Sequence, residues 1–126
     1  MKTGKIIFKK NDDLKHVLKC MPDGYGTYVI YNPSGEIIYI GKAGTVKNDG
    51  SITKQDIKKR LQNVRDNNFK GDIYWKIIME TYCYDFITIE YNIYEYPMFI
   101  PAVKECELLA QYFTKYNKLP LLNNNF

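Results

Sequence analysis

The chain has little cysteine and a single histidine, the residues on which most disulfide scaffolds and transition-metal sites depend. Its cysteines, Cys20, Cys83 and Cys106, are odd in number and form no C-x-x-C pair. We therefore expect neither a disulfide framework nor a cysteine zinc site, but three reduced, partly buried thiols. With His16 as the only histidine, the sequence also argues against a multi-histidine metal site and a Cys-His protease.

Long apolar runs and nucleotide-binding loops are absent as well. No apolar stretch approaches the roughly 20 residues that span a bilayer, and the basic, polar start MKTGKIIFKKNDD lacks the apolar block of a signal peptide. We therefore expect a cytoplasmic protein with no membrane partner. The sequence contains no G-x-x-x-x-G-K-[ST] or G-x-G-x-x-G loop, so nothing in it supports nucleotide-driven phosphoryl transfer.

The 126 residues, 45% of them hydrophobic, are sufficient for one hydrophobic core and too few for two comfortable domains. The net charge is +4 at neutral pH. This mild excess fits a polyanionic partner, but it also fits many proteins that never touch nucleic acid. Charge therefore only modestly favours nucleic-acid binding.

Hydrophobic periodicity predicts an α+β domain. The predicted elements are a strand at 6–8, a helix at 12–21, strands at 27–31 and 36–41, helices at 53–66 and 72–82, a strand at 87–93 and a helix at 101–117. Because Asn32-Pro33-Ser34-Gly35 is typical of a turn, the second and third strands should form a hairpin. We expect a small three-stranded antiparallel sheet flanked by helices, with residues 1–22 as a strand-helix extension packed on a domain formed by residues 23–126.

The predicted hairpin brings two tyrosines together. If its loop has an even number of residues centred on Pro33-Ser34, then Tyr28 and Tyr39 are directly opposed, with Cβ atoms roughly 4.5 to 5.5 Å apart. The chain contains twelve tyrosines, and tyrosine is common in strands. The pair is therefore either an ordinary structural contact or two phenols of a functional site.

The helix predicted from Thr53 carries a charged residue beside its apolar stripe. Arg60 lies at the edge of the stripe formed by Ile57, Leu61 and Val64. A guanidinium beside a core needs a partner such as a carboxylate or a phosphate, so its role is structural or functional. The neighbouring lysines, Lys54, Lys58 and Lys59, fit a solvated face.

Glu105 falls at the centre of the apolar stripe of the last predicted helix, which consists of Ala102, Leu108, Leu109, Tyr112 and Tyr116. Burying an unpaired carboxylate costs several kcal/mol or raises its pKa. A glutamate there needs a compensating cation, metal or hydrogen-bond donor, and the alternative is a structural glutamate that accepts from a tyrosine or lysine. Asn123 could cap, form a turn or bind.

Five segments together resemble a known family. Gly26-Thr27-Tyr28 and Tyr39-Ile40-Gly41-Lys42-Ala43 resemble the paired motifs that name the GIY-YIG endonucleases. Asp56-Ile57-Lys58-Lys59-Arg60-Leu61 resembles the arginine helix of that family, Glu105-Cys106-Glu107-Leu108-Leu109 its glutamate with an aliphatic pair, and Leu119-Pro120-Leu121-Leu122-Asn123 its terminal segment. The five segments follow the family's order and cover about residues 24 to 124.

The resemblance implies a metal-dependent endonuclease that hydrolyses DNA phosphodiester bonds with one divalent ion, Mg²⁺ or Mn²⁺. It implies the following roles: Tyr28 and Tyr39 as active-site phenols, Lys42 and Arg60 as cationic groups, Glu105 as the metal ligand and Asn123 as support. In this hypothesis Tyr28 takes the proton of the attacking water and Arg60 offsets charge on the pentacovalent transition state. DNA is the expected partner, with a homodimer or an additional specificity protein as further partners.

The sequence departs from the family in three places. Thr27 replaces the usual isoleucine, the loop over 44–53 is longer than typical, and Val64 stands where relatives often place His or Tyr. The alternative hypothesis is a non-catalytic or degenerate nucleic-acid-binding module, in which a set of basic residues supplies salt-dependent attraction: Lys54, Lys58, Lys59, Arg65 and Lys70. A third is a protein-interaction domain whose aromatics over 74–99 are pure core.

Overall fold

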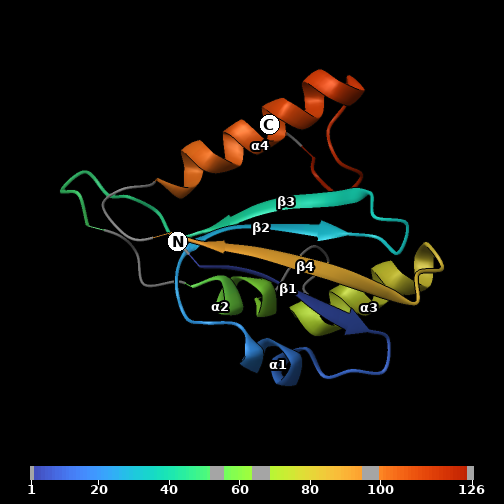
Figure 1. The fold of residues 1–126 in the computed structure, drawn as a ribbon. Helices are drawn as coiled ribbons and strands as arrows, with labels where there is room; N and C mark the ends of the chain where they lie inside the picture. The colour runs from blue at the N-terminus through green and yellow to red at the C-terminus, as the bar shows by residue number, and fades with distance from the viewer. Residues whose placement is uncertain (1, 52–55, 64–68, 95–99, 125–126) are drawn as a thin grey trace.

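The computed structural model describes residues 2–51, 56–63, 69–94 and 100–124 (Figure 1). One antiparallel sheet contains β1 (Lys2–Lys9), β2 (Gly26–Tyr31), β3 (Ile37–Ala43) and β4 (Phe86–Ile93) in the order β1-β4-β2-β3. The helices are α1 (Leu14–Val17), the 3-10 turn η1 (Leu18–Cys20), α2 (Ile57–Gln62), α3 (Gly71–Thr81) and α4 (Pro101–Tyr116). The described part of the chain includes no helix with the length and apolar character of a membrane span.

The α+β class is confirmed, but the sheet has four strands rather than three. The additional strand is β1, which pairs antiparallel with β4 along its whole length, from Lys2 opposite Ile93 to Lys9 opposite Phe86. The sequence pattern predicted only a short strand here because lysines surround its apolar residues. Phe8, which is fully buried, supplies the core contact that fixes this strand to the sheet.

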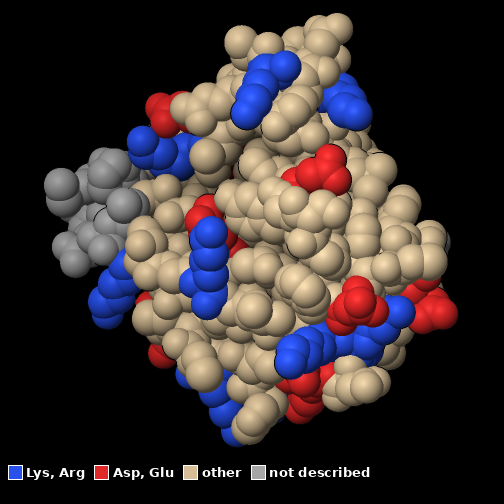
Figure 2. All heavy atoms as spheres, turned by 45° about the vertical axis from the view of Figure 1, so that its right-hand side comes forward, with Lys and Arg blue, Asp and Glu red and all other residues tan. Residues whose placement is uncertain are grey.

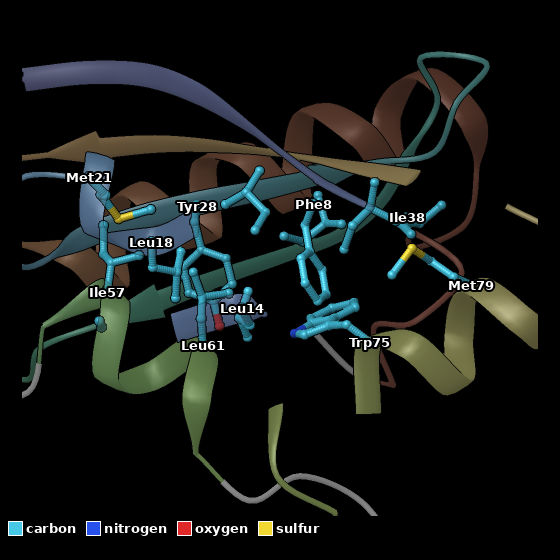
Figure 3. Packing of buried hydrophobic residues seen from close by; sticks show 14 of the residues in the cluster. Phe8, Leu14, Leu18, Met21, Tyr28, Ile38, Ile57, Leu61, Trp75 and Met79 are labelled. Carbon is cyan, nitrogen blue, oxygen red and sulfur yellow. The ribbon is translucent and has the colours of Figure 1, made fainter. Parts of the chain in front are cut away.

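Helices cover both faces of the sheet, and each face has its own core. α1, α2 and α3 lie on one side and α4 on the other (Figure 1). The larger core lies beneath α1–α3, and Figure 3 shows Tyr28 beside Leu18 and Leu61, and Trp75 beside Phe8. The smaller core lies beneath α4.

The predicted hairpin register is wrong. Tyr28 pairs with Gly41, and Tyr39 pairs with Ile30. A β-bulge follows, since Tyr31 faces Ile37, and Ile38 is the extra residue of β3. The tyrosines are therefore diagonal rather than directly opposed. Because they remain on one face of the sheet, their ring centroids still lie only 6.0 Å apart.

Asn32 stabilises the tight hairpin turn that precedes the bulge. Its side chain accepts a hydrogen bond from the Glu36 N–H at 3.0 Å and donates one to Glu36 Oε1 at 3.2 Å. Its own backbone N–H donates to the Glu36 carbonyl at 2.9 Å. The prediction assumed a symmetric loop. It therefore missed the extra residue in β3, Ile38, that shifts the register after this turn.

Several predicted boundaries hold and others do not. α3, β4 and α4 lie within about one residue of their predicted ranges. The N-terminal helix is shorter than predicted, since only Leu14–Val17 is α-helical and a 3-10 turn follows. α2 ends at Gln62, because Asn63 adopts an extended conformation with ψ 161°.

The N-cap of α2 is also different from the predicted one. Asp56 fills this position, and its Oδ1 accepts a hydrogen bond from the Lys59 N–H at 2.8 Å. Thr53, the expected start of the helix, lies outside the described residues.

The cysteines are free, as expected, but their predicted burial is wrong. Cys20, Cys83 and Cys106 are all exposed. Cys20 ends the 3-10 turn, Cys83 follows α3 at a positive φ of 58°, and Cys106 lies on the surface of α4. None of these positions faces a core, which the sequence pattern did not reveal.

Candidate active site

A pocket of about 300 Å³ lies at the end of β3, between α2 and α4. Its lining residues are Tyr39, Lys42, Gly44, Thr45, Arg60 and Glu105. Four of the six were predicted from the sequence as site residues. They meet at the end of β3, which contacts both α2 on one face of the sheet and α4 on the other (Figure 1).

Tyr39 is the predicted phenol that reaches the pocket. Its ring lies 6.0 Å from that of Tyr28, and 6.0 Å from that of Trp75 in an edge-on arrangement. Tyr28 is fully buried in the larger core and does not line the pocket. The two tyrosines therefore occupy different environments, although they are neighbours.

Gly41 provides the space in which both tyrosines pack. A Cβ atom at this position would lie 2.5 Å from Cζ of Tyr28 and 2.8 Å from Cε2 of Tyr39. Both distances are far below a normal carbon contact, so any side chain here would displace the rings. The glycine of the second motif thus acts through packing, because it lets the Tyr28 ring lie across β3.

Arg60 reaches the pocket from α2 and is exposed. Its helix is short, but Ile57 and Leu61 are fully buried in the larger core. The Ile57 N–H also donates to the Gly24 carbonyl at 2.9 Å, which attaches the start of α2 to the segment before β2. These contacts fix the helix that carries the guanidinium.

Glu105 enters from α4 and is half-buried. Burial raises the pKa of its carboxyl group, and the positive charges of Lys42 and Arg60 partly oppose that rise. Both cations are therefore close enough to act on the carboxylate. Among the residues that the structure describes, neither forms an ion pair with it within 4.0 Å, so space remains between the charges.

The donor set suits a hard cation with few protein ligands. Within the described ranges there is no group of three or more His, Cys, Asp or Glu side chains that could hold a metal ion. Mg²⁺ is commonly bound through one or two carboxylates, with water and phosphate oxygens completing its shell. The Glu105 carboxylate in a polar pocket fits this kind of site.

Asn123 lies outside the pocket but touches the strand that forms it. Its Oδ1 accepts from the Ile40 N–H at 2.9 Å, and its Nδ2 donates to the Ile40 carbonyl at 2.9 Å. Ile40 stands between Tyr39 and Gly41, so this pair of bonds holds the motif strand in place. The resemblance implies a supporting role for Asn123, and this contact with the backbone of β3 is compatible with that role.

Of the predicted DNA-contacting residues, the three that the structure describes, Lys58, Lys59 and Lys70, do not line the pocket. Lys58 is paired with Asp23, and this contact holds the pKa of the Asp23 carboxyl below its usual value. Lys59 and Lys70 are exposed, while Lys54, Arg65 and Val64 lie outside the described residues. On the face shown in Figure 2, basic side chains are interspersed with acidic and neutral ones.

Sequence reasoning missed Gly44 and Thr45, which line the pocket from the loop after β3. The sequence marked the whole loop over 44–53, which is rich in glycine, asparagine and aspartate, as a candidate contact for DNA or a partner, without singling out these two residues. Its position directly after the second motif was the available signal.

Comparison with known proteins gives several relatives named UvrABC system protein C. The chain is 31% identical over 105 residues to the UvrABC system protein C of Clostridium perfringens and to that of Clostridium beijerinckii. It is 32% identical over 107 residues to that of Clostridium botulinum. These alignments include 83% to 85% of this chain, which spans only 14% to 15% of the length of each relative.

Two other comparisons found nothing. No protein-family model matches the chain, and no solved structure matches it.

Proposed function

We propose that this chain is an endonuclease domain of the GIY-YIG type that hydrolyses phosphodiester bonds in DNA. The observation that carries the proposal is the pocket itself. Tyr39, Lys42, Arg60 and Glu105 come from three elements, were singled out from the sequence, and line one cavity. The similarity to UvrABC system protein C supports a nuclease-related role for the same stretch of chain.

In this proposal the cations bind the oxygens of a phosphate, and the carboxylate binds the metal ion. Arg60 offers a planar set of donors suited to phosphate oxygens, and in this proposal it offsets the charge that develops in the transition state. Lys42 adds a second positive charge beside the same oxygens. Glu105 would hold Mg²⁺ or Mn²⁺, which supplies Lewis-acid stabilisation of the scissile phosphate and of the leaving oxygen.

The buried position of Tyr28 changes the roles that we assign to the two phenols. The sequence-based hypothesis gave Tyr28 the proton of the attacking water, but its side chain is fully buried. Tyr39 lines the pocket, so we assign it the contact with the water. Its oxygen would orient the water and, in the phenolate form, accept the water's proton to become the neutral phenol. Tyr28 then positions Tyr39 through ring packing.

The first test is cleavage of supercoiled plasmid by the purified protein with Mg²⁺, with Mn²⁺ or with EDTA. Glu105→Gln should abolish metal-dependent nicking because the amide has a similar size but no charge. Glu107→Gln is the matched control, since Glu107 is exposed on the same helix and pairs with Lys104 at 3.1 Å. It should cut like the wild type.

Two results would count against the proposal. Equal cutting by Glu105→Gln and by the wild type would remove the metal assignment. Salt-sensitive DNA binding without any cutting would instead favour the degenerate binding module.

A further inference from the structure

Within the part of the chain that the structure describes, no strand pairs with the outer edge of β3. In an antiparallel pair, the backbone groups of alternate residues point away from the partner strand. Asn123 shows which residues these are, because its side chain bonds both the N–H and the C=O of Ile40. The backbone of Ile40 therefore points away from β2. The same alternation directs the backbone of Lys42, two residues later, to the same side.

The C-terminal segment covers only part of this edge. The Leu122 N–H donates to the Ile38 carbonyl at 2.8 Å, and Asn123 then occupies both groups of Ile40. The next outward position is Lys42. Among the residues that the structure describes, none accepts a hydrogen bond from the Lys42 N–H. The protein's own pairing thus stops one position before the pocket.

The uncovered stretch opens into the candidate active site. Lys42 and Gly44 both line the pocket, together with Arg60. Gly44 has φ +95°, a value that favours glycine, and it turns the chain out of the strand direction. Lys42 therefore has two donors beside the pocket, its side-chain ammonium and a backbone N–H that points away from β2. Backbone N–H groups are common ligands of phosphate oxygens in DNA complexes.

We propose that the DNA backbone occupies this uncovered edge, and that the Lys42 N–H donates a hydrogen bond to a non-bridging oxygen of the phosphate between Arg60 and Glu105. The inference rests on the proposed function and adds a backbone donor to it. Asn123 marks where the protein's own edge pairing ends and substrate begins. A peptide strand is a poorer fit, since among the described residues of this edge only Lys42 to Gly44 is open, and paired strands most often have about five or six residues.

Amide hydrogen exchange followed by NMR on the ¹⁵N-labelled full chain tests this inference. In the free protein the Ile40 N–H should be protected and the Lys42 N–H should exchange quickly. A short DNA duplex added in EDTA, which prevents cutting, should slow exchange at Lys42 by about tenfold or more at saturation, because exchange then proceeds from the free fraction. The Lys42→Gln variant keeps the backbone donor and should show the same protection at higher DNA concentrations.

The outcomes separate the inference from the proposed function. If DNA shifts the resonances of Arg60 and Tyr39 while exchange at Lys42 is unchanged, the edge contact is wrong and the nuclease proposal stands. If DNA perturbs no resonance, both are wrong. Asn123→Ala is the complementary variant, since it should make the Ile40 N–H exchange quickly in the free protein.

Discussion

The two motif tyrosines are neighbours, but only one of them reaches the pocket. Tyr39 lines the pocket and touches Trp75, whereas Tyr28 is enclosed by the larger core. Their contact passes over Gly41, where no side chain fits. One motif tyrosine is therefore placed to act on a ligand, and the other is placed to hold the first.

A pair of phenylalanine variants tests this difference. Tyr39→Phe should lower the cleavage rate by about 10²-fold or more, the usual contribution of a general base or acid. Tyr28→Phe keeps the ring against Gly41 and Tyr39 and should change the rate only slightly. Single-turnover cleavage of the two variants at saturating DNA gives the comparison. A larger loss in Tyr28→Phe would return the base to Tyr28.

The site residues were easier to predict than their geometry. Glu105 and Arg60 stand out in the sequence because each places a charge in or beside an apolar stripe, a conflict that needs a local explanation. The relation between the tyrosines could not be predicted, because one bulge residue in β3 changes the register of the hairpin. Thr45 was missed since a residue in a loop has no periodicity to place it.

At the scale of elements, α2 is a short helix that carries Arg60 into the pocket. It has six residues, fewer than an isolated helix needs, and it must place Arg60 opposite Glu105. Its stability comes from two buried side chains and from the Asp56 cap. The periodicity predicted the helix, but its end at Gln62 depends on Asn63, whose extended backbone no local pattern indicated.

The Asp56 cap therefore links stability to activity. Asp56→Ala should reduce the free energy of unfolding by about 0.5 to 2 kcal/mol, the usual effect of losing an N-cap. It should also slow cleavage, because Arg60 lies in the turn that the cap fixes. Asp56→Asn retains a capping oxygen and should restore most of both quantities. Denaturant unfolding and plasmid nicking measure them, and full activity in Asp56→Ala would show that Arg60 does not depend on the cap.

Elements with strong periodicity were predicted well, and β1 was not. α3, β4 and α4 are long enough for their apolar spacing to determine both type and limits. β1 contains Lys2, Lys5 and Lys9, which mask its alternation, and it becomes a full strand because β4 offers an edge for pairing. That tertiary pairing is not encoded in the segment itself.

At the scale of the whole molecule, the candidate site reduces stability. Burial raises the pKa of Glu105, which means that the fold favours its protonated form. The stability gained from that proton is fully present below the ordinary glutamate pKa of 4.5, and it is lost as pH rises through the higher pKa of the folded state. At neutral pH the ionised carboxylate therefore lowers the free energy of unfolding.

Glu105→Gln should consequently raise the Tm at neutral pH while it removes activity. The increase should shrink as the pH falls below 4.5, where the wild-type carboxyl is protonated too. Glu107→Gln should give no such pattern, since Glu107 is exposed. Thermal unfolding of both variants between acidic and neutral pH measures the effect, and a lower Tm for Glu105→Gln at neutral pH would contradict it.

The sheet also sets the distance between the two helices that carry Arg60 and Glu105, because both charges reach the pocket at the end of β3. Arg60 and Glu105 are carried by helices on opposite faces, so the side chains beneath each helix set the gap between the two charges. Leu109 and Val29 determine the height of α4 above the sheet, while Ile57 and Leu61 determine that of α2. Adding or removing one methyl group in either core should therefore change the distance between the helix and the sheet. The width of the pocket thus depends on core residues that do not line it.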